Sequence, residues 1–452
     1  VSNGAGTGMR AQGTTGTLRA IMLLALPVTA LIAFAFWAAI QFIEPPPPTY
    51  MRIAAATKGS PYYALAERYK AHLAKNGVTL DIRETGGSFD NLKLLGDPGF
   101  GVGLGFLQGG IANEKSAPGL RSLGRVMYEP LWIFANVDAR VERIADLAGK
   151  RVLVGPAGGG TNSLAVRMLD ANDVSATNAK LVNMELPDYV DELESGRADA
   201  GFLVLAAGAR TIQRLFNSPR VKLVNLAQAE AYSQRFPFLS PLVLKQGLVS
   251  FAKNVPPTDT ALVATRTALA VRGDLHPALA NLMTQTMIAV HNEPDVNDKG
   301  EAAIFARAGE FPMAADPELE LSDQARRVYR SGPPFLQKFL PFGIATMLDR
   351  LAVLALPLLG IALPVIRFAP MIYTWQVRQR LLFWYRELKK VERGVSAQTS
   401  ADTVLAKLAQ VEEIEEAVNR IPIPLAFTNQ LYDLRGHIDM VRRRLNTVRT
   451  HV

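Results

Sequence analysis

Three loops that combine glycine with hydroxyl side chains carry the residue types best suited to hold a ligand. They are Thr57–Tyr63, Thr85–Ser88 and Gly155–Asn162. Each comes directly before a segment with helical spacing, where unpaired backbone N–H groups and the positive end of the helix dipole favour an anion. Any one of these loops could be only a helix cap or a tight turn. Three loops in equivalent places indicate a site for a small acidic ligand.

The sequence contains no complete motif for nucleotide binding, metal binding or acid–base catalysis. Gly155–Thr161 has the glycines of a phosphate-binding loop, but Thr161 stands where that loop needs lysine. Gly101–Gly105 is close to a dinucleotide fingerprint, but Phe106 replaces the last glycine. The 5 histidines lack metal-ligand spacing, no Ser/His/acid grouping stands out, and the chain has 0 cysteines. We therefore predict a binding protein and not an enzyme, with no cofactor and no metal.

Strand and helix patterns alternate through the part of the chain that contains these loops. Apolar or alternating runs at Met51–Ala55 and Val78–Arg83 predict strands, and Tyr63–Lys75 between them has helical spacing. The cycle continues with Leu131–Val137, Arg151–Gly155, a helix at 162–171, Lys180–Met184, a helix at 189–195 and Ala200–Leu205. This order predicts an α/β fold with a parallel sheet, whose ligands bind at the carboxyl ends of the strands.

Several motifs in this block resemble one known family. The run Thr85–Asn91 is similar to the T-G-G-S-x-x-N segment of TAXI-type solute-binding proteins of tripartite ATP-independent periplasmic (TRAP) transporters. Tyr62-Tyr63, Tyr128–Leu131, Asp146–Val152 and Val154–Pro156 fit the same family in order. The resemblance covers residues 50–335, and the chain looks like the membrane-anchored branch of the family.

The resemblance implies a two-lobed periplasmic-binding-protein-like domain that closes around a small carboxylate, such as an amino acid or organic acid. Lobe one would comprise 50–132 and 256–334, and lobe two 133–255, with hinge strands near Leu131–Val137 and Thr260–Ala264. The ligand-binding residues carried over by motif would be Gly59, Ser60, Tyr63, Thr85, Gly86, Gly87, Ser88, Asn91, Gln108 and Tyr128 from lobe one and Gly158, Gly159, Gly160, Thr161 and Asn162 from lobe two.

One departure from the family lies in the predicted site. The second-lobe loop of relatives tends to read G-S-G-T-R, whereas Gly159 and Asn162 stand here in place of the serine and the arginine. This removes a hydroxyl and a fixed cation, so a diacid would need another positive charge. Lys58 and Arg125 are the candidates, although each could instead pair with a local carboxylate.

Long apolar runs flank the α/β block. Leu18–Phe42 and Leu351–Ile366, with arginines outside them, predict two membrane helices and cytoplasmic termini. A cleaved secretory signal is the alternative for the first run. The predicted order is a flexible tail (1–17), a transmembrane helix (18–43), a Pro-rich linker (44–49), the solute-binding domain (50–334), an interfacial segment with a second transmembrane helix (335–370), and a cytoplasmic basic helix with a helical hairpin (371–452).

The function predicted from these features is that of a two-pass inner-membrane protein whose periplasmic domain captures a small anionic solute for a TRAP-type transporter. The expected partners are the solute, the membrane and permease subunits or a cytoplasmic protein. A net charge of +8 is weak evidence for nucleic acid, which we do not expect. The near-heptad hairpin at 404–448 leaves an alternative open, a ligand-sensing receptor or scaffold that signals through these helices.

Overall fold

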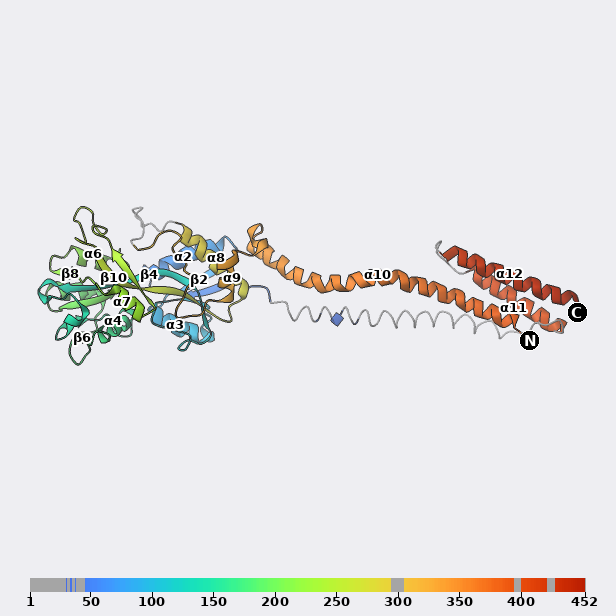
Figure 1. Ribbon diagram of the computed structural model, residues 1–452, viewed down its shortest axis with the longest axis horizontal. Helices are drawn as coiled ribbons and strands as arrows, with labels where there is room; N and C mark the ends of the chain where they lie inside the picture. Colours follow the sequence, from blue (N-terminus) through green and yellow to red (C-terminus); the bar gives the residue numbers. More distant parts are fainter. Residues whose placement is uncertain are drawn as a thin grey trace. The chain divides into compact units, whose positions relative to one another are not determined.

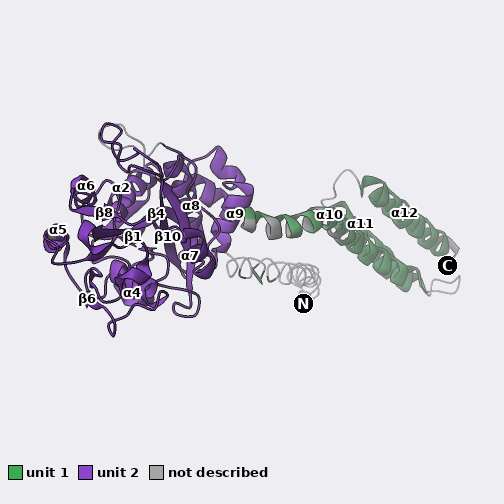
Figure 2. Cartoon of the chain, turned by 60° about the vertical axis from the view of Figure 1, so that its left-hand side comes forward, with its two compact units in different colours: residues 1–44, 351–452 green, residues 45–350 purple. Residues whose placement is uncertain are grey.

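The computed structural model describes residues 30, 33–34, 37, 45–293, 305–393, 400–420 and 427–451. The chain divides into two compact units (Figure 2). Residues 45–350 form one unit, which we call the α/β unit, and residues 1–44 with 351–452 form the other, which we call the helical unit.

The α/β unit alternates strands and helices as its hydrophobic patterns predict. Its first part contains β1 (Tyr50–Ala54), α2 (Pro61–Ala74), β2 (Thr79–Arg83), α3 (Ser88–Gly96), β3 (Leu104–Leu107) and β4 (Leu120–Asn136). The middle part contains β5 (Arg151–Leu153), α4 (Gly160–Asp170), β6 (Lys180–Val182), α5 (Leu186–Glu194), β7 (Ala200–Val204), α6 (Arg210–Asn217), β8 (Val221–Leu223), α7 (Ala229–Arg235) and β9 (Leu239–Leu244). The last part contains β10 (Thr260–Arg272), α8 (Pro277–Asn292) and α9 (Asp323–Ser331).

These strands form one 10-stranded sheet with the order β2-β1-β3-β10-β4-β7-β5-β6, in which β8 also pairs with β4 and β9 with β10. The strands β1, β2 and β3 are parallel to one another at one end, and β5, β6 and β7 are parallel at the other. The long strands β4 and β10 run antiparallel side by side in the middle and connect the two halves (Figure 1).

Each half of the sheet has its own apolar core. In the first half, α2 buries Tyr62, Leu65, Tyr69 and Leu73, which recur on one face of the helix, against β1 and α8. In the second half, alternate residues of β4 face opposite sides, and the 2 resulting clusters contain Leu131 and Ile133 on one side and Trp132 and Phe134 on the other. Full burial of each such side chain contributes about 1.5–3 kcal/mol.

The predicted α/β fold is therefore confirmed, but the sheet is mixed and not wholly parallel, because β4 and β10 pair antiparallel with their neighbours. The predicted hinge strands coincide with β4 and β10, although both strands extend further along the chain than the sequence pattern indicated. The predicted lobe boundaries stay a prediction. Below, lobe one means the half of the sheet with β1, β2 and β3, and lobe two means the half with β5, β6 and β7.

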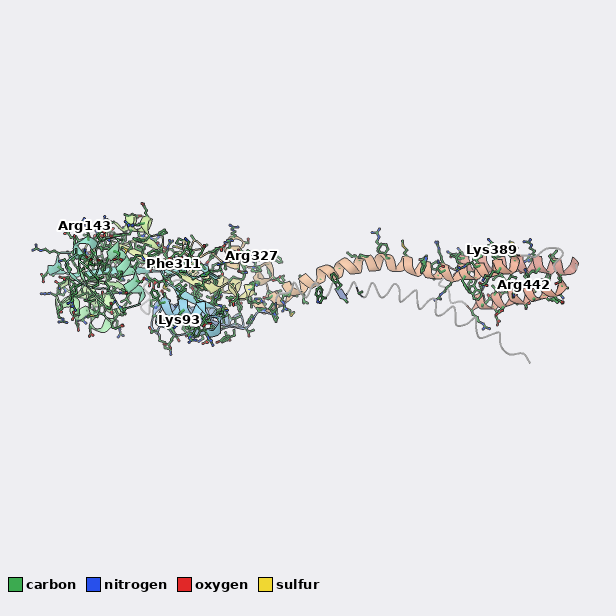
Figure 3. The ribbon with its side chains drawn as sticks, turned by 90° about the horizontal axis from the view of Figure 1, so that it is seen from below. Lys93, Arg143, Phe311, Arg327, Lys389 and Arg442 are labelled. Carbon is green, nitrogen blue, oxygen red and sulfur yellow. The ribbon has the colours of Figure 1, made fainter. Side chains whose placement is uncertain are left out.

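The helical unit contains most of α10 (Phe342–Glu392), together with α11 (Ala401–Asn419) and α12 (Thr428–His451). Its core includes Leu388 from α10, Val411 from α11 and Ile438 from α12. Figure 3 labels Lys389 and Arg442 in this unit. The basic segment after the apolar run continues α10 as far as Glu392. Residues 421–426, between α11 and α12, lie outside the described residues.

The prediction of a two-pass inner-membrane protein is wrong, because no helix in the described part of the chain has the length and apolar character needed to span a bilayer. The apolar run of α10 between Arg350 and Arg367 explains this for the second predicted span. At about 1.5 Å per residue it measures about 24 Å, whereas a hydrocarbon core is about 30 Å thick. The first predicted span, 18–43, lies outside the described residues except for Ala30, Ala33, Phe34 and Trp37.

Candidate functional site

Two of the three predicted glycine loops lie at one edge of lobe one, together with the predicted residue Gln108. The strands β1, β2 and β3 are parallel, so their carboxyl ends meet at the same edge of the sheet. The loop with Gly59 and Ser60 follows β1, the loop with Thr85 follows β2, and Gln108 follows β3. Spacing along the chain alone could not bring these loops together; the parallel register does so.

Ser88 connects these loops through its hydroxyl group. The backbone N–H of Gln108 donates to Ser88 Oγ at 2.9 Å, and the Tyr62 hydroxyl lies 3.2 Å from the same atom. Both Ser88 and Gln108 are buried, with 8% and 6% of their surface exposed. Ser60 caps α2 by accepting the N–H of Tyr63 at 3.3 Å, and Tyr63 itself is half-buried.

Asn91 and Thr85 are bonded within lobe one. Asn91 is 0% exposed, and its amide donates to the carbonyl of Phe106 at 2.9 Å. The Thr85 hydroxyl lies 2.6 Å from Oδ1 of Asn91 and 2.6 Å from the carbonyl oxygen of Ala55, and it accepts the N–H of Gly87 at 3.1 Å. These contacts hold the Gly86-Gly87 turn in place, so the structure places Asn91 and Thr85 as supports for the loop.

The corresponding turn in lobe two opens α4 without a side-chain cap. Gly159 is the N-cap residue of this helix, and glycine has no side chain that could accept the first N–H groups. Gly155 and Gly158 have φ of +79° and +72°, the left-handed region that glycine adopts readily. Thr161 accepts the N–H of Val204 at 3.2 Å. The N–H groups in the first turn of α4 therefore have no side-chain cap, and the hydrogen bond between Thr161 and Val204 holds the turn in place. Such an uncapped helix start suits an anion.

A surface depression at this turn is lined by residues of both lobes. Its volume is about 430 Å³, and its lining combines Phe89 from the first turn of α3 with residues of the lobe-two turn and of α4: Gly158, Gly159, Asn162, Ser163, Val166, Arg167 and Asp170. Beside it, a Cβ atom on Gly160 would overlap Oε1 of Gln108 and lie 3.1 Å from its Cδ. Gln108 and Gly160 therefore meet across the two lobes.

The two candidate cations from the sequence both have carboxylate partners. Arg125 is 1% exposed and forms ion pairs with Asp316 and, at 2.9 Å, with Glu318. Lys58 lies 3.1 Å from Glu84. Neither lines the depression, because β4 carries Arg125 into the interior of lobe one and Lys58 pairs with the neighbouring strand end.

The cation that does line the depression is Arg167, which the sequence analysis did not single out. Its Nη2 donates to the carbonyl oxygen of Gly110 at 3.2 Å, and its guanidinium lies 5.1 Å from the centre of the Phe238 ring. A signal was present in the sequence: Arg167 follows Gly160 by two helical turns, so both lie on the same face of α4. This arginine connects lobe two to the Gln108–Gly110 loop of lobe one.

Tyr128 contacts Glu310 and Phe311, which are not among the predicted ligand-binding residues. Its hydroxyl donates to Glu310 Oε1 at 3.0 Å, and its ring packs edge-on against Phe311, with the ring centres 4.9 Å apart (Phe311 is labelled in Figure 3). Burial, followed by this hydrogen bond to Glu310, raises the pKa of Tyr128 to about 12. The neighbouring residue Glu129 faces the Tyr62 side instead, because successive residues of a strand point to opposite faces.

Metal ligation has no support in the part of the chain that the structure describes, where no group of three or more His, Asp or Glu side chains is placed to hold an ion. The arrangement offers bare amides, hydroxyl groups, one arginine (Arg167) and one carboxylate (Asp170) around the depression. These groups can bind a ligand by hydrogen bonds and charge.

Comparison with family models gives a match over residues 53–330, more than half of the chain. The chain belongs to the NMT1-like family. The matched range of this NMT1-like protein includes the depression and nearly the whole sheet, whereas α10, α11 and α12 lie beyond it. The family model does not specify the TAXI-type proteins that the sequence motifs resemble, so that narrower assignment stays a prediction.

Solved structures resemble this NMT1-like chain at low identity. The periplasmic aliphatic sulphonate binding protein SsuA from Escherichia coli is 15% identical, with a TM-score of 0.36 over 54% of this chain and 68% of that chain. A protein from Bordetella bronchiseptica RB50 is 14% identical (TM-score 0.42; 64% and 99%). PhnD1 from Prochlorococcus marinus, solved with methylphosphonate, is 12% identical (TM-score 0.37; 58% and 94%). Scores this low carry no argument about the ligand of this chain.

Proposed function

We propose that this protein is an extracytoplasmic solute-binding protein that holds a small anionic solute between the two lobes of its α/β unit. The observation that carries the proposal is the uncapped first turn of α4, which faces Phe89 across the depression and meets Gln108 at Gly160. Free N–H groups at the start of a helix bind an anion without a change in protonation, which suits reversible capture.

The lobe-one loops support the same function. Ser88, Tyr62 and Gln108 form a bonded cluster at the carboxyl ends of the strands, so this wall is already shaped before a solute arrives. Preorganised groups cost little ordering entropy on binding. Arg167 adds a positive charge at the edge and connects the lobes when they are together.

We further propose that the solute is a small carboxylate and that the protein delivers it to a TRAP-type transporter. This narrower proposal rests on the sequence motifs, including Thr85–Asn91 and Tyr128–Leu131. The uncapped amides alone would suit a sulfonate or a phosphonate as well, because all three groups present acceptor oxygens with negative charge.

Isothermal titration calorimetry of the full chain tests both proposals. The panel should contain amino acids, dicarboxylates, alkylsulfonates and alkylphosphonates at equal ionic strength. We expect saturable 1:1 binding of at least one anion. If only a sulfonate or a phosphonate binds, the carboxylate proposal is wrong and the anion proposal stands. If no anion binds, the solute-binding function is refuted.

A further inference from the structure

The hinge strands carry a carboxylate that has hydroxyl partners but no positive one. Glu129 lies on β4 opposite Thr265 of β10 and is partly buried. Its Oε2 accepts hydrogen bonds from the Thr267 hydroxyl at 2.7 Å and from the Tyr62 hydroxyl at 3.0 Å. No Lys, Arg or His in the described ranges forms an ion pair with Glu129. A carboxylate offers about four lone-pair sites, so two bonds to one oxygen leave acceptor capacity.

Glu129 is joined to the cleft by a short chain of hydrogen bonds. The Tyr62 hydroxyl, which reaches Glu129, also lies 3.2 Å from Ser88 Oγ, and Ser88 Oγ accepts the N–H of Gln108 at 2.9 Å. Gln108 is the residue that meets Gly160 of lobe two. The carboxylate therefore belongs to the same wall as the lobe-one loops of the proposed solute site.

Among the residues that the structure describes, Glu129 has no cation beside it, whereas the buried acids near Arg125 do form ion pairs. Arg125, on the same strand, pairs with both Asp316 and Glu318 in the interior. Burial raises the pKa of Glu129, and interactions with the Thr267, Tyr62 and Thr265 hydroxyls only oppose that rise. A carboxylate withdrawn from water without a cation is unfavourable, and a bound positive group would remove this cost.

We propose that Glu129, with the hydroxyls of Tyr62 and Thr267, binds a protonated amino group of the solute. This inference rests on the proposed solute-binding function and deepens it. The solute then carries a positive nitrogen for lobe one and a negative group for the amides of α4. A purely anionic solute would leave Glu129 without a positive partner and would add a second negative charge to the same site.

The binding test uses the full chain and matched pairs of solutes that differ only in the amino group, namely glutamate with glutarate and alanine with propionate. Calorimetry measures both members of each pair at the same pH and salt concentration. We expect the amino member of a pair that binds to have a Kd at least tenfold lower than its partner. Equal affinities within every binding pair, or preference for the deaminated member, would overturn the subsite.

Two variants test whether the charge of Glu129 causes the tighter binding of the amino member of each pair. Glu129→Gln keeps the size and the acceptor oxygen, and we expect it to abolish the preference by weakening only the amino member. Thr267→Val removes one hydroxyl of the subsite and its hydrogen bond to Glu129 without a change of charge, so we expect it to reduce the preference for the amino member less than Glu129→Gln does. If Glu129→Gln weakens both members equally, Glu129 has a structural role and the inference is wrong.

The same data separate this inference from the function on which it rests. If neither member of any pair binds, and the wider anion panel also fails, the solute-binding function falls and the subsite falls with it. If anions bind but the amino group brings no advantage, the function stands and only the subsite is refuted. Because the wild-type comparison needs no substitution, a variant that fails to fold cannot obscure the result.

Discussion

Replacement of Gly160 by alanine tests whether the solute is bound in the conformation in which Gln108 of lobe one contacts Gly160 of lobe two. The new Cβ would overlap Oε1 of Gln108 and lie 3.1 Å from its Cδ, whereas carbon atoms in contact are about 3.5–4.0 Å apart. Gln108 is 6% exposed, so its side chain has little room to turn aside. Either Gln108 must shift within a packed wall or the lobes must separate.

The magnitude follows from the cost of an extra methyl group in a packed contact, about 1–3 kcal/mol. If this cost falls only on the closed form, Gly160→Ala weakens solute binding by about 5- to 150-fold. Calorimetry with a solute identified from the anion panel measures the loss. The thermal midpoint without solute should change little, because the open form has no clash.

Two further variants make this prediction specific. Gly96→Ala is the matched control: Gly96 also lies in a helix of the α/β unit, and a Cβ there would meet nothing within 4 Å, so affinity should be unchanged. Gln108→Ala combined with Gly160→Ala removes the obstructing side chain, and we expect it to recover part of the affinity. Unchanged affinity in Gly160→Ala alone would refute the reasoning.

Three other perturbations have defined outcomes. Arg167→Gln removes the cation beside the depression and should weaken anion binding by about 3- to 30-fold in calorimetry, with a smaller loss at high salt. Arg125→Ala leaves Asp316 and Glu318 without their cation and should lower the free energy of unfolding in urea by about 3–5 kcal/mol. Burial lowers the pKa of His291 from 6.5 to about 4, so the unfolded chain takes up a proton on this imidazole more readily than the folded chain does. The free energy of unfolding should therefore fall by about 2 kcal/mol from pH 8 to pH 5. His291→Gln should remove this contribution to the pH dependence of the free energy of unfolding.

Local patterns in the sequence were sufficient for the elements and the type of fold. The helical spacing of Tyr63–Lys75 corresponds to α2, and the run Ala200–Leu205 corresponds to β7. The glycine turn before α4 was also visible, because a helix start and a glycine-rich loop are set by neighbours along the chain. The apolar run Leu351–Ile366 misled the interpretation, because its hydrophobicity was read as a membrane span although it is short for one.

The partners of charged and polar side chains were decided only by the tertiary structure. Arg125 finds Asp316 at a separation of 191 residues, which no spacing rule predicts. The sequence motif predicts Tyr128 as a ligand contact, which stays a prediction; only the structure shows that Tyr128 is bonded to Glu310 and that Glu129, beside it on β4, is bonded to Tyr62. Periodicity determines which residues share a face. Which face borders the cleft depends on how strands distant in sequence pair, and that is a property of the folded sheet.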